Sequence, residues 1–89
     1  MRPALVISAT TFNQGPAGLA VIIPLTTRSR RIASWIEILP PEGGIRQPSY
    51  VMCEQVRSAS RERLVEQWGT VSARTVVLVE DLLRILLQL

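Results

Sequence analysis

The segment from Arg2 to Thr26, RPALVISATTFNQGPAGLAVIIPLT, contains two apolar runs separated by a turn. The first run covers residues 3–8 and the second covers residues 19–26, and both contain valine and isoleucine, which favour extended strands. Between them, residues 13–18 (NQGPAG) hold the glycine and proline that are typical of turns. Proline at position 3 fits the first residue of a strand, where no ladder hydrogen bond is lost. The segment therefore predicts two strands that pair with each other.

The middle of the sequence predicts two more strands. Residues 27–31 form a polar, basic loop, and residues 33–39 then alternate as a half-buried strand. Residues 40–44 (PPEGG) break this pattern, because two prolines and two glycines do not continue a strand. Residues 49–56 form the fourth predicted strand.

Helical signals follow these strands. Ser60 is expected to cap a short helix that carries Glu62 in its first turn and ends at Gly69. A second helix is predicted from Ser72 onward, because apolar residues recur there at helical spacing. These residues are Val76, Val79, Leu82, Leu83, Leu86 and Leu89.

The composition indicates one globular domain over residues 1–89. Apolar residues make up 47% of the sequence and charged residues 19%, which is enough apolar surface for one modest core. No apolar stretch reaches the roughly 20 residues of a membrane span, and no signal-peptide pattern is present. The single cysteine, Cys53, cannot form an intrachain disulfide, so a cytoplasmic protein is expected.

The charged residues limit the possible chemistry. All ten basic residues are arginine, seven residues are acidic, and the net charge is +3. Arginine binds phosphate through two parallel hydrogen bonds, although net charge alone identifies no partner. Because the sequence has no histidine and one cysteine, the usual zinc sites are excluded, and no metal or other cofactor is expected.

Three separated segments resemble the MazF/PemK/Kid toxins, which are ribosome-independent endoribonucleases. They are RPALVIS (residues 2–8), IIPLTTR (residues 22–28) and SYVMCEQVRS (residues 49–58), and LLRILLQL (residues 82–89) is similar to the closing helix of the family. The resemblance implies a mainly β (α+β) fold: a small SH3-like antiparallel barrel of the CcdB/PemK type, with a short helix and a C-terminal amphipathic helix. It also implies a homodimer, a single-stranded RNA substrate and an antitoxin whose tail occupies the RNA groove.

The start of the sequence departs from the family pattern. Family members usually begin with a strand of the type GDIVWVDF and a glycine-rich loop, whereas this sequence starts at the Arg2-Pro3 pair. The sequence is therefore expected to lack the N-terminal strand of the family. A barrel without one strand exposes two unpaired edges.

The family motifs imply three candidate catalytic residues. Arg2 matches the arginine that opens the RPxLV motif, and Thr26 matches the threonine of the LTSR segment; both would stabilise charge on a phosphate. Glu54 takes the place of an acidic residue that one branch of the family uses as a general base. Glutamate is one methylene longer, and Met52 stands where that branch has an arginine, so the resemblance favours Arg2 and Thr26.

The same motifs imply RNA contacts from exposed polar residues. Arginines in such loops contact the RNA backbone, which fixes position without reading sequence. Gln55 also fits a structural hydrogen-bonding role, and Arg31 fits a solvated loop as well as it fits a contact. The candidate RNA-binding residues are Arg28, Arg30, Gln55, Arg57 and Ser58.

Three other residues have simpler interpretations. Cys53 is expected to be a small buried apolar residue, because nothing near it in the sequence indicates a reactive thiol. Trp35 and Trp68 are expected in the core or in a dimer interface. Stacking of an RNA base on Trp35 is the less favoured interpretation.

The sequence thus predicts metal-independent cleavage of single-stranded RNA by attack of the 2′-hydroxyl, with 2′,3′-cyclic phosphate products. Three alternatives stay open at this point. One is a CcdB-like toxin that binds DNA gyrase, although the tail ending in LLQL lacks the tryptophan region of those proteins. The others are an inactive SH3-like module that binds RNA or an antitoxin, and a plain structural protein.

Overall fold

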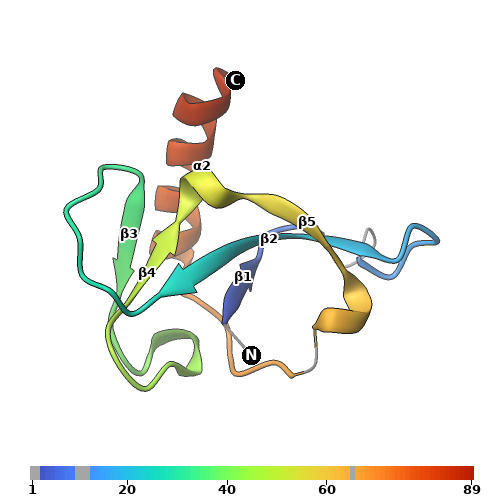
Figure 1. Cartoon of the computed structure of the whole chain (residues 1–89), viewed down its shortest axis with the longest axis horizontal. Helices are drawn as coiled ribbons and strands as arrows, with labels where there is room; N and C mark the ends of the chain where they lie inside the picture. Colours follow the sequence, from blue (N-terminus) through green and yellow to red (C-terminus); the bar gives the residue numbers. More distant parts are fainter. Residues whose placement is uncertain (1–2, 10–12, 65) are drawn as a thin grey trace.

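The two apolar runs near the start of the chain form the hairpin on which the sheet is built (Figure 1). The structure is a computed structural model that describes residues 3–9, 13–64 and 66–89. Strand β1 (Ala4–Val6) pairs antiparallel with β2 (Leu19–Thr26), and Ala4 lies opposite Pro24. The predicted pairing is confirmed, and β1 is shorter than the predicted run.

Strand β2 is the longest strand and pairs along both of its edges. One edge carries β1, and the other carries β4 (Ser49–Met52) followed by β5 (Arg57–Ser60). Strand β3 (Trp35–Ile38) pairs with the far edge of β4. All these pairings are antiparallel, and the sheet has the order β1-β2-β4-β3, with β5 beside β2.

The single strand predicted over residues 49–56 is wrong in its second half. Strand β4 ends at Met52, and a 3-10 turn, η2 (Cys53–Gln55), follows before β5 begins. Val51 pairs with Leu25, whereas Arg57 pairs with Ile22, so the five residues 52–56 run alongside only two residues of β2, 23 and 24. Element η2 is therefore a bulge between two strands that follow the same edge of β2, and such bulges re-aim side chains and increase twist.

This bulge explains why a proline is tolerated inside β2. The Leu25 N–H donates to the carbonyl of Pro3, the residue before β1, at 3.1 Å, so the neighbouring Pro24 directs its nitrogen to the opposite edge. At that edge η2 leaves the ladder. Proline has no N–H to donate, and no ladder bond is lost at this position.

The short helix predicted from Ser60 to Gly69 is reduced to one 3-10 turn, η3 (Arg61–Arg63), and Ser60 makes no side-chain cap. The segment after η3 packs instead against the turn η1 (Glu42–Gly44). The Gly43 N–H donates to the Thr70 carbonyl at 3.2 Å, and a Cβ on Gly69 would lie 2.9 Å from the Gly43 carbonyl carbon. This tertiary contact overrides the local helix signal.

The predicted C-terminal helix is confirmed as α2 (Ala73–Leu87), with Ser72 as its N-cap. The Ser72 hydroxyl accepts a hydrogen bond from the Thr75 N–H at 3.2 Å. The Glu42 carboxylate accepts from the Ser72 N–H at 3.0 Å and also from the Thr75 hydroxyl. Element η1 is thereby tied to the start of α2.

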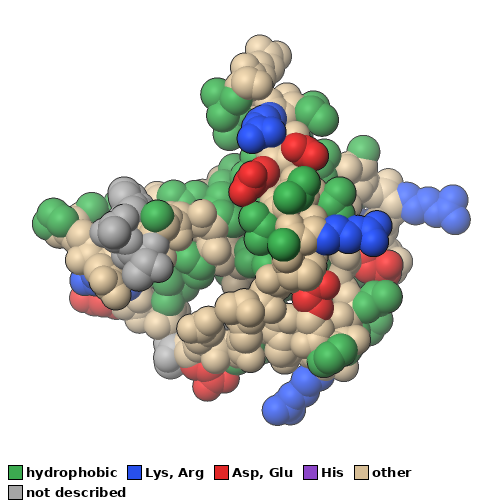
Figure 2. Space-filling model, turned by 180° about the vertical axis from the view of Figure 1, so that it is seen from behind, with side chains coloured by type: hydrophobic (Ala, Val, Ile, Leu, Met, Phe, Trp, Pro, Cys, Tyr) green, Lys and Arg blue, Asp and Glu red, His purple; other side chains and the backbone are tan. Residues whose placement is uncertain are grey.

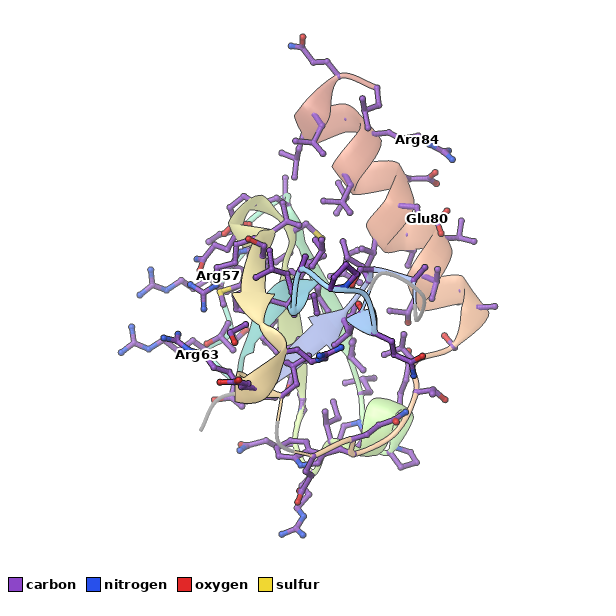
Figure 3. The ribbon with its side chains drawn as sticks, turned by 90° about the vertical axis from the view of Figure 1, so that its right-hand side faces the viewer. Arg57, Arg63, Glu80 and Arg84 are labelled. Atoms are coloured by element: carbon purple, nitrogen blue, oxygen red, sulfur yellow. The ribbon has the colours of Figure 1, made fainter. Side chains whose placement is uncertain are left out.

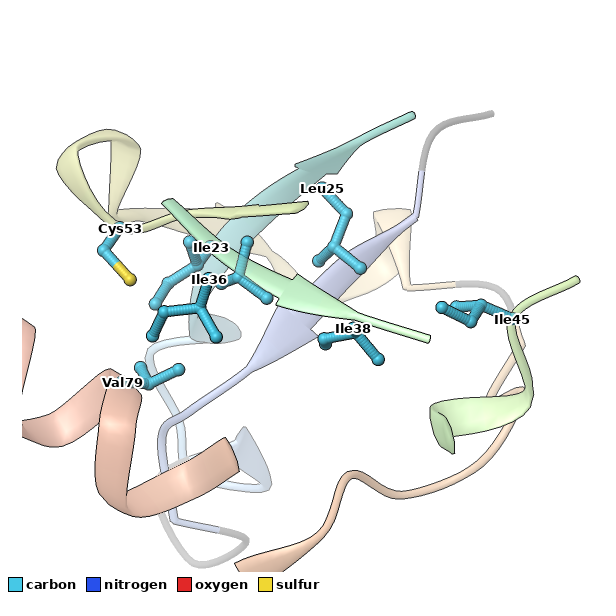
Figure 4. Close-up of a cluster of buried hydrophobic side chains, with 8 residues drawn as sticks. Ile23, Leu25, Ile36, Ile38, Ile45, Cys53 and Val79 are labelled. Carbon is cyan, nitrogen blue, oxygen red and sulfur yellow. The ribbon is translucent and has the colours of Figure 1, made fainter. Parts of the chain in front are cut away.

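The core lies between the sheet and α2 (Figure 4). Val79 of the helix is 2% exposed and packs with apolar side chains from β2, β3 and β4. The buried cluster is Ile23, Leu25, Ile36, Ile38, Ile45, Val51, Cys53 and Val79. Within the described residues no helix has the length and apolar character needed to cross a bilayer.

Candidate functional site: the sheet face opposite the terminal helix

The sheet face turned away from α2, called here the outer face, carries the candidate site. Leu25, Val51 and Ile36 pack into the core with Val79, so the residues next to them in each strand point to the outer face. Thr26 is paired with Tyr50, and Tyr50 is paired with Glu37. Directly paired residues share a face, so Thr26, Tyr50 and Glu37 form one row across three strands.

Thr26, the predicted phosphate ligand, is half-buried at the end of β2. Its Oγ1 accepts a hydrogen bond from the Arg28 N–H at 3.2 Å. The hydroxyl proton has no acceptor among the described residues, so it can be donated to a phosphate oxygen. The start of β1 lies beside this end of β2, because the Pro3 carbonyl accepts from the Leu25 N–H. Arg2 lies outside the described residues, and its catalytic role stays a prediction.

Glu54, the third predicted catalytic residue, is held by two donors from the start of β3. The Ser34 hydroxyl donates to Oε1 at 2.6 Å, and Trp35 Nε1 donates to Oε2 at 3.0 Å. Partial burial raises the pKa of Glu54, but the hydrogen bonds from Ser34 and Trp35 outweigh it and hold the pKa below its ordinary value. A carboxylate with a lowered pKa is a weak proton acceptor, so the geometry favours a positioning role for Glu54.

Two aromatic rings lie beside Thr26 on the outer face. The ring centroids of Trp35 and Tyr50 are 6.1 Å apart, with an angle of 37° between the ring planes. The Tyr50 hydroxyl donates to Glu37 Oε2 at 3.3 Å. Sequence reasoning missed Tyr50 and Glu37, because only the strand register places them in the row with Thr26.

The basic loop from residue 27 to residue 34 borders these rings. Arg28, Arg30 and Arg31 are exposed in this loop, and none of them makes a salt bridge with any described residue. The loop and the strands enclose an open groove of about 510 Å³. The groove is lined by Ser29, Arg30, Arg31, Ile32, Ala33, Trp35, Glu37 and Tyr50.

The remaining predicted RNA-binding residues lie on η2 and β5. Arg57 and Ser58 are both exposed, and Figure 3 shows Arg57 and Arg63 extending to the side away from α2. Alternation along β5 points Ser58 to the opposite side from Arg57, so Ser58 is not brought together with Thr26. Gln55 is exposed, and its Nε2 lies 3.6 Å from the Met52 sulfur.

Cys53 is fully buried in the core, as predicted, and burial raises the pKa of its thiol to about 11. A thiol that stays protonated at neutral pH is a poor nucleophile and a poor metal ligand. The described residues contain no group of three or more cysteine, histidine or acidic side chains that could hold a metal ion.

A second cavity, of about 600 Å³, lies just beyond the end of β2, where Pro3, Thr27 and Ser49 form part of its lining. Thr27 lines this cavity, whereas Thr26 lies in the outer-face row. Trp68 is also part of the lining and is 50% exposed, so it is not a core residue within this chain. Its Nε1 donates to Glu66 Oε1 at 2.5 Å.

Comparison with known proteins gives matches over almost the whole chain. Residues 1–87 match the family described as PemK-like, MazF-like toxin of type II toxin-antitoxin system. A chain of the crystal structure of MazE–MazF from Deinococcus radiodurans is 32% identical, with a TM-score of 0.83, over 98% of this chain and 85% of that chain.

Two more distant structures share the fold. The Mycobacterium tuberculosis toxin MazF-mt6 is 22% identical, with a TM-score of 0.84, over 99% of this chain and 87% of that chain. An endoribonuclease in complex with its cognate antitoxin, from a mycobacterial species, is 24% identical with a TM-score of 0.82, over 99% of this chain and 82% of that chain. These likenesses confirm the predicted mainly β fold with a C-terminal helix.

Proposed function

Because the chain belongs to the PemK-like, MazF-like toxin family of type II toxin–antitoxin systems, we propose that it is an endoribonuclease that cleaves single-stranded RNA without a metal ion in the cytoplasm. The main support for this proposal is that the outer face brings together groups that can bind a phosphate. Thr26 offers a hydroxyl proton there, and Arg28 is exposed beside it. Arg57 extends to the same side of the sheet (Figure 3). A hydroxyl and guanidinium groups are ligands that suit a phosphate.

The proposed reaction is an in-line displacement at phosphorus. The ribose 2′-oxygen forms a bond to phosphorus and loses its proton, the bond to the 5′-oxygen breaks, and that oxygen takes up a proton. The products are a 2′,3′-cyclic phosphate and a 5′-hydroxyl. Thr26 and Arg2 stabilise the negative charge that builds up on the phosphate oxygens, which is the effect that contributes most in such reactions.

Glu54 supports this site by holding other residues in place. Its two oxygens are already engaged by Ser34 and Trp35, and its pKa is below the ordinary value. A carboxylate in this state accepts a proton from the 2′-hydroxyl poorly. We therefore assign the acceleration to charge stabilisation and positioning.

The partners follow from the same family membership. A cognate antitoxin would neutralise the toxin by covering the outer face, and the active form would be a homodimer. Support for the antitoxin comes from the solved MazE–MazF complex of Deinococcus radiodurans and from the mycobacterial complex. Support for the dimer comes from the exposed apolar residues of α2, among them Ile85 at 72% exposure.

The test is cleavage of a long single-stranded RNA by the purified full chain in excess EDTA. We expect cleavage at discrete positions, products that end in cyclic phosphate, and no cleavage of DNA with the same sequence. Dependence on magnesium or products with a 3′-hydroxyl would overturn the mechanism. If the RNA stays intact both with and without magnesium, the protein is not a nuclease, and the alternative of an inactive binding module is favoured.

A further inference from the structure

Trp35 and Tyr50 form an aromatic surface beside Thr26, called here the aromatic platform. We propose that this platform stacks one unpaired base of the RNA next to the phosphate that is cut. The proposal rests on the proposed function, because RNA is the ligand in both. It goes further by naming the side chains that hold the base, and it assigns Glu54 to the support of this surface.

The platform is fixed before any ligand binds. The Trp35 indole is held at its nitrogen by Glu54 Oε2, and its backbone is paired with Met52. Tyr50 is held at its hydroxyl by Glu37. Preorganised rings lose little conformational entropy on binding, so more of the stacking energy appears as affinity.

The platform is also open on one side. Trp35 and Tyr50 are half-buried, and both line the groove of about 510 Å³ together with Arg30 and Arg31. Aromatic rings combined with basic side chains are the typical surface for single-stranded nucleic acid, because bases stack on the rings and the cations contact the backbone.

The position relative to Thr26 fits one nucleotide. Tyr50 is the direct partner of Thr26 in the sheet, so the two backbones are one strand spacing apart, ~4.8 Å. Trp35 lies on β3, one strand further and in the neighbouring row, where it pairs with Met52, and its ring centroid is 6.1 Å from that of Tyr50. A phosphate at Thr26 and a base over the platform therefore belong to the same or the adjacent nucleotide.

Carboxylates next to the platform can accept hydrogen bonds from an RNA base. Glu37 lies in the groove lining, and Glu54 accepts the hydrogen bond from Trp35 Nε1. A base carries amino groups that can donate to a carboxylate, as cytosine does to glutamate.

The test uses the Trp68→Phe variant, in which Trp35 is the single tryptophan, and an RNA oligonucleotide with 2′-O-methyl groups that cannot be cleaved. We expect the Trp35 fluorescence to fall on titration with this RNA.

Trp35→Ala should weaken RNA binding about 5- to 150-fold, the range for loss of one stacked base. Trp35→Phe should keep most of the affinity, and Tyr50→Ala should weaken binding in the same direction. Leu39→Ala, at an exposed apolar residue outside the groove lining, is the matched control and should bind like the parent.

A second set of oligonucleotides isolates the stacking contact. Each carries one abasic position, and at one position the missing base should weaken binding to the parent but not to Trp35→Ala. If each abasic position weakens binding equally in the parent and in Trp35→Ala, the proposed stacking on the platform is wrong, while the proposed RNA cleavage is unaffected. Unchanged RNA affinity in Trp35→Ala, with loss only of an antitoxin-derived peptide, would make the surface a protein-docking site and also overturn it. A parent protein that binds no RNA would overturn the proposed function as well.

Discussion

For single residues, charge stabilisation and base catalysis predict different rankings of the loss of cleavage rate among substitutions at Arg2, Thr26 and Glu54. Arg2→Ala should lower the cleavage rate by about 10²-fold or more, the range seen when one preorganised stabilising group is removed. Thr26→Val should cost less than Arg2→Ala, and Glu54→Gln should cost least, because the Glu54 carboxylate is occupied by Ser34 and Trp35. Single-turnover rates on one RNA, for variants shown to fold by circular dichroism, measure this order. A folded Glu54→Gln that is inactive, beside an active Arg2→Ala, would make the carboxylate the principal catalyst.

At the scale of elements, Glu42 joins η1 to the N-terminus of α2, and this link should make stability depend on pH. Hydrogen bonds from the Thr75 hydroxyl and then the Ser72 N–H lower the pKa of Glu42. The stabilisation is therefore complete above the ordinary glutamate pKa of about 4.3 and is lost as pH falls through the lower folded pKa. Glu42→Ala should reduce the free energy of unfolding by about 1–2 kcal/mol at pH 7, and the difference from the parent should narrow as the pH falls below the ordinary glutamate pKa. Urea unfolding measures it, with Glu80→Ala, an exposed carboxylate on α2, as control. A difference that grows on acidification would contradict the link.

The contact between η1 and the segment before α2 gives a second prediction at this scale. A Cβ on Gly44 would lie 2.2 Å from the Trp68 carbonyl oxygen, and Gly44 has φ +75°. Gly18 has a similar φ of +66° but nothing within 4 Å of the added atom. Gly18→Ala should therefore cost about 1–2 kcal/mol of strain, whereas Gly44→Ala should cost clearly more. Thermal unfolding of the two variants compares them, and equal losses would show that this contact is loose.

The sequence predicts correctly those helices and strands that depend on neighbouring residues in the chain. Strand β2 begins and ends at the predicted residues, and α2 begins at Ala73, directly after the predicted start at Ser72. The η2 bulge and the loss of the helix after Ser60 depend on contacts between distant segments, so no local signal shows them. The same distinction applies to the residues of the candidate site. Thr26 follows from a motif, whereas Tyr50 becomes its neighbour only through the strand register.

At the scale of the whole molecule, exposed apolar residues on α2 predict association. Figure 2 shows hydrophobic side chains on both sides of the charged ones along this helix. Leu78 and Ile85 are 42% and 72% exposed, one heptad apart, with the half-buried Leu82 between them. Such a stripe suits a symmetric contact with a second copy.

We expect a dimer at micromolar concentration in sedimentation experiments. Ile85→Glu should shift the population toward monomer without changing the circular dichroism spectrum, because this side chain makes little contact within its own chain. Arg84→Gln, at an exposed neighbour, changes the net charge by the same single unit and is the matched control. A wild-type chain that sediments as a monomer would argue against the dimer.

In the proposed reaction the outer face cuts RNA through the ribose 2′-hydroxyl with no metal ion. Its most direct test is an RNA oligonucleotide with a single 2′-deoxy nucleotide on the 5′ side of the mapped cleavage position, incubated with the full chain in excess EDTA. We expect this substrate to stay intact while the all-ribose version is cut to a 2′,3′-cyclic phosphate. Cleavage of the deoxy-substituted oligonucleotide at the same position would contradict it, because water or another nucleophile would then be attacking the phosphate.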